Sequence, residues 1–306
     1  MKQHLAAASL ALATSTFSLA AQSSPVWQPL WADQEAPGAP RLPEGSEKVK
    51  NQRLYTDVEV PQFAFTPASG EPSGHCVIIL PGGGYEFISF LNEGTEMASL
   101  LAEQGIASLI IKYRVSGKDE AGFQFPVPLL DARRAIRTAR ARAKEWQVDP
   151  KKIGVLGFSA GGHLAACTAT MFDRKFEDEA GDQIDQKSPR PDFQTLVYPV
   201  ISMGQPWVHP GSQRRLAGPS PDIQTLLKMN PTESITERTP PLFLIHASDD
   251  RPVPLRNSTE YLGICAQNQV PVTAFIVPKS GHAFGTRGKG STTGWTDDLI
   301  LWIQNQ

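Results

Sequence analysis

The chain is organised around one stretch, Lys152-Ile153-Gly154-Val155-Leu156-Gly157-Phe158-Ser159-Ala160-Gly161-Gly162-His163-Leu164-Ala165. Its first part is a short apolar run typical of a buried parallel strand, and its last part is small, apolar and compatible with a helix. Ser159 lies between them, flanked by Gly157 and Gly161, which carry no Cβ to clash with the strand and helix. This Gly-x-Ser-x-Gly spacing predicts a nucleophile elbow, and a glycine-rich turn with an incidental serine is the alternative.

Length and charge limit the classes of protein to consider. The chain has 306 residues, enough for one large α/β domain or two small ones, and a formal net charge of −2. Without a basic excess or interleaved aromatic residues, nucleic acid is not an expected partner. The basic residues between Arg133 and Lys144 surround a stripe of small side chains, which predicts a helix with a solvated outer surface.

Residues 1–20 form a separate segment. A weakly basic start precedes an alanine- and leucine-rich run, and Ser18-Leu19-Ala20 fits the small-x-small rule for cleavage. We therefore expect a secretory signal peptide and an exported protein, periplasmic or secreted, with no membrane association after cleavage. A retained anchor is the alternative. The three cysteines are an odd and sparse set, which predicts small buried side chains rather than a disulfide framework, although one bridge stays open.

The remaining chain divides into a lead-in and one domain. Residues 21–52 lack a sustained period and predict an extended lead-in, whereas residues 53–65 alternate and predict one or two antiparallel edge strands. From His75 onward strands alternate with helices. The expected strands are 76–80, 107–112, 153–156, 196–198, 242–247 and 272–277, and the expected helices are 93–104, 129–146, 160–172, 255–267 and 296–303. Residues 53–306 thus predict one α/β domain, a mostly parallel sheet with helices on both faces.

A serine nucleophile needs a base, and the base needs an acid to orient it. His282 follows the last expected strand, at the edge of the sheet where Ser159 should also emerge, and is the candidate base. Asp249 and Asp250 both follow the preceding strand. Asp250 is favoured because it is followed by x-x-Val-Pro, the arrangement found after the acid in many serine hydrolases of this architecture, and Asp249 would then cap the loop or helix. The order Ser159, Asp250, His282 is the one expected for a strand-turn-helix serine hydrolase.

An acyl-transfer site also needs donors for the oxyanion. Pro81-Gly82-Gly83-Gly84-Tyr85 follows the first central strand, and the amides of Gly83 and Gly84 are candidate donors together with that of Ala160. Phosphate binding is the rival interpretation of such a loop. It is disfavoured because neither Gly-x-Gly-x-x-Gly nor a Gly-Lys-Ser/Thr ending is present.

These motifs, with Asp250-x-x-Val-Pro and Gly281-His282-x-Phe-Gly, resemble the α/β-hydrolase superfamily, near the esterases related to hormone-sensitive lipase. More narrowly, four further segments resemble bacterial acetylxylan-esterase-like proteins, some of them labelled xylanase: Pro81 to Tyr85, Lys112-Tyr113-Arg114, Val148 to Ile153, and His209-Pro210-Gly211-Ser212 through Gly218. The resemblance covers His75 to the C-terminus. Pro81 stands where the lipase-related group has histidine, which argues against lipase-like substrates.

Other notable residues are interpreted as structural. His163 would buttress the elbow, Arg114 and Asp131 would form a buried pair, and His246 would be satisfied within the core. Tyr85 or Trp207 is expected to pack against an acyl or sugar group. No metal-ligand motif is present, and no cofactor is expected.

The sequence therefore predicts an exported serine carboxylesterase that removes short acyl groups, notably acetyl, from small-molecule or oligosaccharide esters such as xylan fragments. A serine peptidase of the same fold and a non-catalytic binding relative are the alternatives. No paired carboxylates of the kind a xylanase needs were identified. The oligomeric state is not predicted.

Overall fold

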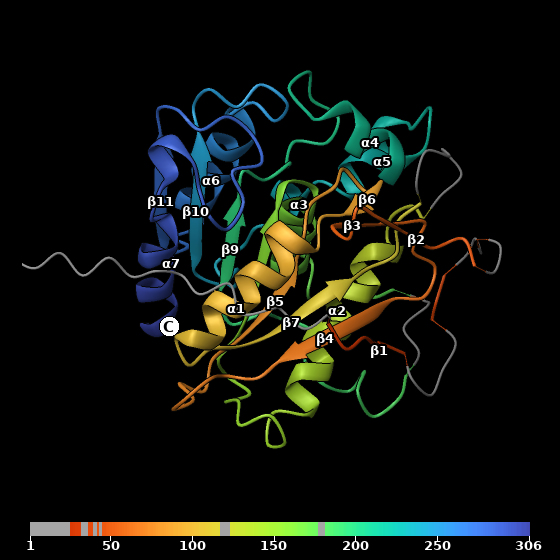
Figure 1. The fold of residues 1–306 in the computed structure, drawn as a ribbon. Coiled ribbons are helices and arrows are strands. Elements are labelled where there is room, and N and C mark those ends of the chain that lie inside the picture. Colours follow the sequence, from red (N-terminus) through yellow and green to blue (C-terminus); the bar gives the residue numbers. More distant parts are fainter. Residues whose placement is uncertain (1–24, 32–35, 39–41, 43–44, 117–122, 177–180) are drawn as a thin grey trace, which may run out of the picture.

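Strands and helices alternate along most of this chain (Figure 1). The computed structural model describes residues 25–31, 36–38, 42, 45–116, 123–176 and 181–306. The expected signal peptide, residues 1–20, lies outside the described residues. The lead-in is described in part, and it contributes Leu30 and Trp31 to the core.

The main sheet has eight strands in the order β1-β4-β7-β5-β8-β9-β10-β11. Their bounds are β1 Gln28–Pro29, β4 Gln62–Thr66, β5 Cys76–Leu80, β7 Ala107–Lys112, β8 Ile153–Phe158, β9 Gln194–Val197, β10 Leu242–Ala247 and β11 Val272–Val277. Strands β7 to β11 in this order pair in parallel, whereas β4 and β1 pair antiparallel. The expected edge strands of residues 53–65 therefore separate. β4 joins the main sheet, and β3 (Leu54–Thr56) joins a small sheet with β2 (Lys48–Lys50) and β6 (Phe87–Ile88).

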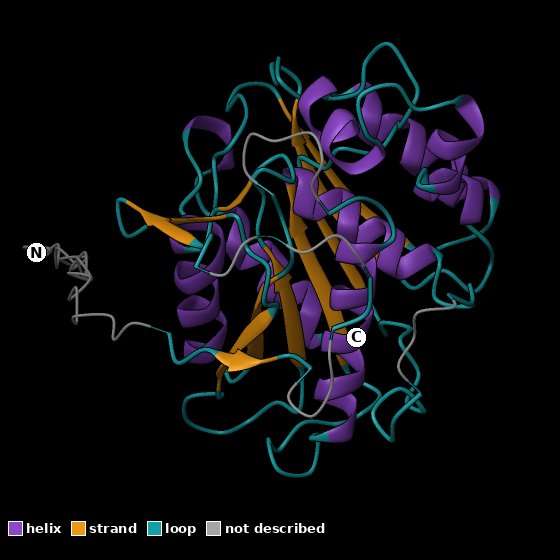
Figure 2. Ribbon diagram, turned by 90° about the vertical axis from the view of Figure 1, so that its right-hand side faces the viewer, coloured by secondary structure: helices purple, strands orange, loops and turns teal. Residues whose placement is uncertain are grey.

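Helices cover both faces of the main sheet, which confirms the predicted α/β-hydrolase architecture (Figures 1 and 2). The α-helices are α1 Glu96–Glu103, α2 Val127–Ala141, α3 Ser159–Thr170, α4 Pro210–Ala217, α5 Ile223–Lys228, α6 Arg256–Gln267 and α7 Trp295–Gln304. Three short turns complete the set: η1 Leu91–Thr95, which is π-helical, η2 Pro231–Ser234 and η3 Gly290–Thr292. Among the described residues, none of the helices has the length and apolar character needed to cross a membrane.

Strand β5 explains why the central strands are apolar at every position. Val77 and Ile79 pack in the core cluster that includes α1 and α7, whereas Cys76, Ile78 and Leu80 pack in the cluster that includes α2, α3 and α6. Because both faces of the strand are covered, neither set of alternating side chains reaches water. All three cysteines are free and buried, and burial raises the pKa of Cys76 and of Cys265 to about 12.

The arginines of α2 do not form the predicted solvated surface. Arg133, Arg134 and Arg137 are buried, with exposed fractions of 2%, 2% and 6%. The reason is the insertion that follows α3, which packs over this face. Its Asp182 and Asp185 pair with Arg134, and Asp185 also pairs with Arg137. Arg134 and Arg137 therefore pair with carboxylates that lie far along the chain.

A buried ion pair ties the end of β7 to α2, as the sequence predicts. The Asp131 carboxylate accepts hydrogen bonds from Nε and Nη2 of Arg114, at 2.9 and 2.8 Å, and also from the Arg114 backbone amide and the Trp31 indole. Both charged side chains are almost completely excluded from solvent. Asp131 therefore compensates a buried cation that would otherwise be very unfavourable.

We expect Asp131→Asn to lower the free energy of unfolding by about 3–5 kcal/mol, because it leaves the Arg114 charge buried without its counter-ion. Urea unfolding of the purified protein measures this. The matched control is Glu145→Gln, which removes one carboxylate from the exposed pair with Arg142 and should change stability little. Equal losses in the two variants would contradict the assignment of Asp131 as a compensating buried charge.

Candidate active site

Ser159 occupies a strained position between β8 and α3. Its φ of +52° lies in the left-handed region, which non-glycine residues adopt rarely. The two flanking glycines are required by space, because a Cβ on Gly157 would lie 2.1 Å from the carbonyl oxygen of Gly161, and one on Gly161 would lie 2.1 Å from that of Leu80. The predicted Gly-x-Ser-x-Gly turn therefore has the geometry of a nucleophile elbow.

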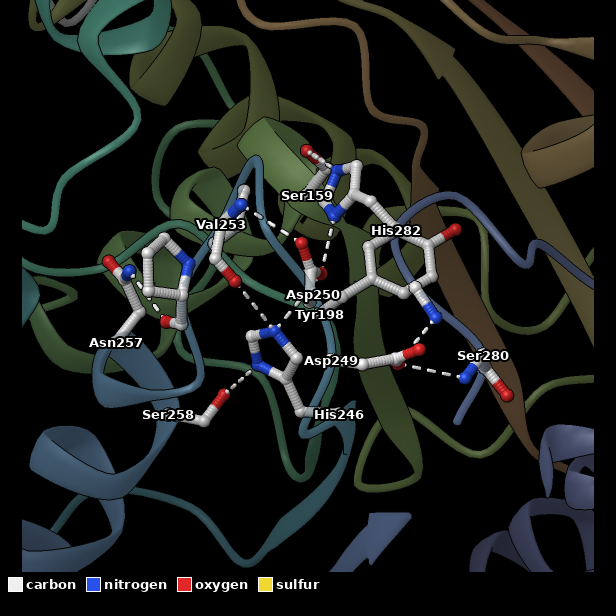
Figure 3. A network of polar contacts seen from close by, with 12 residues as sticks. Ser159, Tyr198, His246, Asp249, Asp250, Val253, Asn257, Ser258, Ser280 and His282 are labelled. Carbon is white, nitrogen blue, oxygen red and sulfur yellow. Dashed lines mark hydrogen bonds and ion pairs between the residues drawn. The ribbon is translucent and has the colours of Figure 1, made fainter. Parts of the chain in front are cut away.

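The structure brings Ser159, His282 and Asp250 into one line of contacts (Figure 3). The Ser159 hydroxyl lies 2.9 Å from Nε2 of His282, and Nδ1 of the same ring lies 2.6 Å from Oδ2 of Asp250. Each residue comes from the carboxyl end of a different parallel strand: β8, β11 and β10. A hydroxyl, an imidazole and a carboxylate in this order can deprotonate the serine and stabilise the resulting imidazolium.

The Asp250 carboxylate is held by three donors. Oδ1 accepts the Val253 amide at 2.9 Å, and Oδ2 accepts both His282 and, at 3.1 Å, Nε2 of His246. Burial favours the neutral acid, but the hydrogen bonds from His246, His282 and Val253 prevail and lower the pKa of Asp250 to about 2. Asp250 therefore stays ionised over the range in which an imidazole titrates.

Asp249 takes the capping role that the sequence assigns to it. Its Oδ1 accepts the amides of Ser280 and Gly281 at 2.9 and 2.7 Å, and these bonds lower the pKa of Asp249. Asp249 thus fixes the loop that carries His282. Among the hydrogen bonds of the described residues, none joins Asp249 to the His282 imidazole.

His246 belongs to the contacts of Asp250, although its sequence context predicts a residue satisfied within the core. It is buried at the end of β10, and its Nε2 also lies 3.0 Å from the Val253 carbonyl, while Nδ1 lies 2.6 Å from the Ser258 hydroxyl. Because the carbonyl and the ionised carboxylate only accept, Nε2 carries a proton and donates it toward both. The only sequence signal was a histidine four residues before the acid, which fits a core role equally well.

The glycine turn after β5 has two amides that point away from the side on which its carbonyls accept hydrogen bonds. The carbonyl of Gly82 accepts from Ser89 at 3.0 Å, and that of Gly83 accepts from Glu86 at 2.9 Å. In a trans peptide the N–H points opposite to the carbonyl, so the amides of Gly83 and Gly84 face the other side of the turn. The turn lies against Ser159, since a Cβ on Gly82 would be 3.0 Å from Cβ of that serine. In the first turn of α3, Ala160 has an amide that no helical carbonyl can reach.

The two predicted substrate contacts have different surroundings. Tyr85 is buried at 2% exposure, and its hydroxyl lies 2.8 Å from Nδ1 of His163, so its ring braces the elbow helix rather than facing a ligand. His163 in turn contacts the Met229 carbonyl at 2.9 Å, consistent with its expected buttressing role. Trp207 has the Arg256 guanidinium over its ring at 3.6 Å. Its contact with substrate stays a prediction.

Helices α4 and α5 are not among the helices that the sequence predicts. Both are short and begin at side-chain caps, His209 for α4 and Asp222 for α5. His209 lies near the site: a Cβ on Gly84 would be 3.6 Å from its Cε1. Burial and the charge of His282 lower the pKa of His209, which favours a neutral ring. Arg215 of α4 pairs with Glu86 and thereby ties α4 to the glycine turn.

Among the described residues, no group of three or more His, Cys, Asp or Glu side chains is placed to hold a metal ion.

Comparison with known proteins shows the family of this chain and its similarity to a solved structure. The BD-FAE family model matches residues 64–262. A solved acetyl ester-xyloside bifunctional hydrolase from Caldicellulosiruptor lactoaceticus superposes with a TM-score of 0.76 at 32% identity, covering 92% of this chain and 94% of that one.

Two curated relatives are much longer than this chain. An acetylxylan esterase from Xylanibacter ruminicola is 31% identical over 236 residues, which cover 76% of this chain and 45% of that protein. Endo-1,4-beta-xylanase B from Butyrivibrio fibrisolvens is 29% identical over 224 residues, which cover 72% of this chain and 34% of that protein. The chain thus spans less than half the length of these curated relatives. On the family match and the shared architecture, the chain belongs to the BD-FAE family and has the α/β-hydrolase fold.

Proposed function

We propose that the protein is a serine carboxylesterase that hydrolyses short acyl esters, with acetyl groups on xylan or related polysaccharide fragments as its substrates. The observation that carries the proposal is the continuous contact from Ser159 through His282 to Asp250 beside the glycine turn. Relatives named as an acetylxylan esterase and as an acetyl ester-xyloside hydrolase support the choice of substrate.

The proposed reaction proceeds through an acyl-enzyme. The Ser159 oxygen attacks the ester carbonyl carbon while Nε2 of His282 takes the serine proton, and the carbonyl oxygen becomes an oxyanion bound by the amides of Gly83, Gly84 and Ala160. The intermediate collapses as the bond to the alcohol breaks, and His282 gives the proton to the departing oxygen. Water then attacks the acyl-serine, with His282 again taking and returning a proton, and the carboxylic acid leaves.

Polar side chains near the glycine turn support a small acyl group. His209 and Ser212 approach Gly84 from α4, at 3.6 and 3.9 Å from the position of a Cβ on that glycine. These two side chains present polar atoms beside one of the proposed oxyanion donors. A short acyl group on a hydroxyl-rich alcohol fits such surroundings better than a long acyl chain does.

The test combines acetate release with covalent labelling. We expect the purified protein to release acetate from acetylated xylan oligosaccharides faster than from acetylated pectin or glucomannan oligosaccharides, and to cleave p-nitrophenyl acetate faster than p-nitrophenyl decanoate. A fluorophosphonate should modify the peptide that contains Ser159, as measured by mass spectrometry. Absence of both labelling and ester hydrolysis would refute the proposed activity, and faster cleavage of the decanoate would refute the preference for short acyl groups.

A further inference from the structure

Glu93 is a buried carboxylate for which the proposed reaction has no role. It lies in the π-helical turn η1 and is 4% exposed. No lysine or arginine among the described residues forms an ion pair with it, although burying a carboxylate without a cation is costly. Single π-helical turns occur often at functional sites, so the contacts of this side chain are informative.

The carboxylate connects two loops of the site. Oε2 of Glu93 accepts the amide of Gly82 at 2.7 Å, and Oε1 accepts the hydroxyl of Tyr198 at 2.7 Å. The Tyr198 oxygen in turn accepts the amide of Gly285, three residues after His282, at 3.2 Å. The Tyr198 ring also packs edge-on against the imidazole of His282, with 4.8 Å between the ring centroids. Figure 3 shows this ring beside His282.

Glu93 is also close to the nucleophile. A Cβ on Gly82 would lie 2.9 Å from Oε2 of Glu93 and 3.0 Å from Cβ of Ser159, so only this glycine separates the carboxylate from the serine. The preceding residue locks η1 to the histidine loop, because the Asn92 carbonyl accepts the Thr286 hydroxyl at 2.7 Å. The π-helical turn η1 thus contacts both the glycine turn and the loop that carries His282.

We infer that Glu93 is a positioning residue for the reaction: it holds Gly82 so that the next two amides keep their direction, and it braces His282 through Tyr198. The inference rests on the proposed function and deepens it. When Ser159 loses its proton to His282, the imidazolium has Asp250 at Nδ1 and the Glu93 carboxylate beyond Tyr198. No proton moves to Glu93, which acts through geometry and charge.

The charges around Glu93 are consistent with this role. The titratable groups that face it are Tyr113 after β7, Tyr198 after β9 and His282 after β11. Burial raises the pKa of Glu93, while the hydrogen bonds from Tyr198 and Gly82 and the charge of His282 favour the carboxylate. An anion at this position attracts the positive charge that develops on the His282 ring during the reaction.

The test uses Glu93→Gln, with Glu96→Gln as the matched control. Glu96 is three residues later, begins α1 and pairs with the exposed Arg287. For p-nitrophenyl acetate hydrolysis we expect E93Q to lower kcat by about 10- to 100-fold with little change in KM, a smaller loss than removal of a whole oxyanion donor can cause. E96Q should match the unmodified protein in both kcat and KM.

Tyr198→Phe separates the two contacts. It keeps the Glu93 bond to Gly82 but removes the link to Gly285, so we expect a smaller loss in kcat, again with little change in KM. A folded E93Q with unchanged kcat would overturn the inference. If E93Q fails to fold, unchanged kcat in Y198F overturns it. An inactive Ser159→Ala beside a fully active E93Q defeats only the Glu93 inference, whereas an active Ser159→Ala defeats the proposed function itself.

Discussion

Ser159→Ala should lower kcat for p-nitrophenyl acetate by on the order of 10⁶-fold, the scale seen when a triad nucleophile is removed. Without the hydroxyl no acyl-enzyme forms, and His282 has no group to deprotonate at 2.9 Å. Alanine adopts the strained φ of +52° at the same cost as serine, so thermal unfolding should change little. The measurement is steady-state hydrolysis at equal concentrations of folded protein.

A control serine makes this loss specific. Ser69 is exposed in the turn between β4 and β5, at the end of β5 opposite the glycine turn, and Ser69→Ala should keep full activity. Fluorophosphonate labelling should persist in S69A and vanish in S159A. Retention of ester hydrolysis in S159A, at a rate comparable with that of S69A, would show that another group is the nucleophile.

The elements that the sequence predicts best are those whose pattern has one physical cause. Strands β5, β7, β10 and β11 begin and end at the predicted residues. For β5, β7 and β10, which are buried at every position, the reason is that a parallel strand between helices needs a continuous apolar run and ends where polar or turn residues start. The candidate triad follows from the same logic. A residue that directly follows a parallel strand must lie at one known edge of the sheet, so its approximate position is set without any tertiary contact.

What escaped prediction depends on partners far away in the chain. The contact of Glu93 with Tyr198 joins residues 105 positions apart, and nothing in the local pattern distinguishes Glu93 from a helical surface residue. Arg134 is buried where it pairs with Asp182, 48 residues later. The expected helix 93–104 is also not α-helical throughout, since residues 91–95 form a π-helical turn before α1 begins. Burial of polar groups follows from the assembled fold and has no periodic signal.

Asp250→Asn should lower kcat by roughly 10⁴-fold while leaving the backbone in place, because it reverses the tautomer of the base. All three groups bound to this carboxylate are donors: the Val253 amide, His246 and His282. Asparagine offers a single acceptor oxygen. If that oxygen keeps the Val253 amide, the new NH₂ group faces the imidazoles, and His282 must accept at Nδ1. Its Nε2 then carries a proton toward Ser159 and cannot take another.

The pH dependence and a neighbouring variant separate this effect from general disruption. Because the pKa of Asp250 is about 2, its own titration should not appear in the activity profile of the unmodified protein above about pH 4. Asp249→Asn keeps an acceptor for Ser280 and Gly281, so weakening those bonds should cost less than about tenfold in kcat. Steady-state kinetics from pH 4 to pH 9 on both variants provide the measurement. A large loss in D249N with a small loss in D250N would exchange their roles, since only the residue that fixes the Nδ1 proton of His282 can have the larger effect.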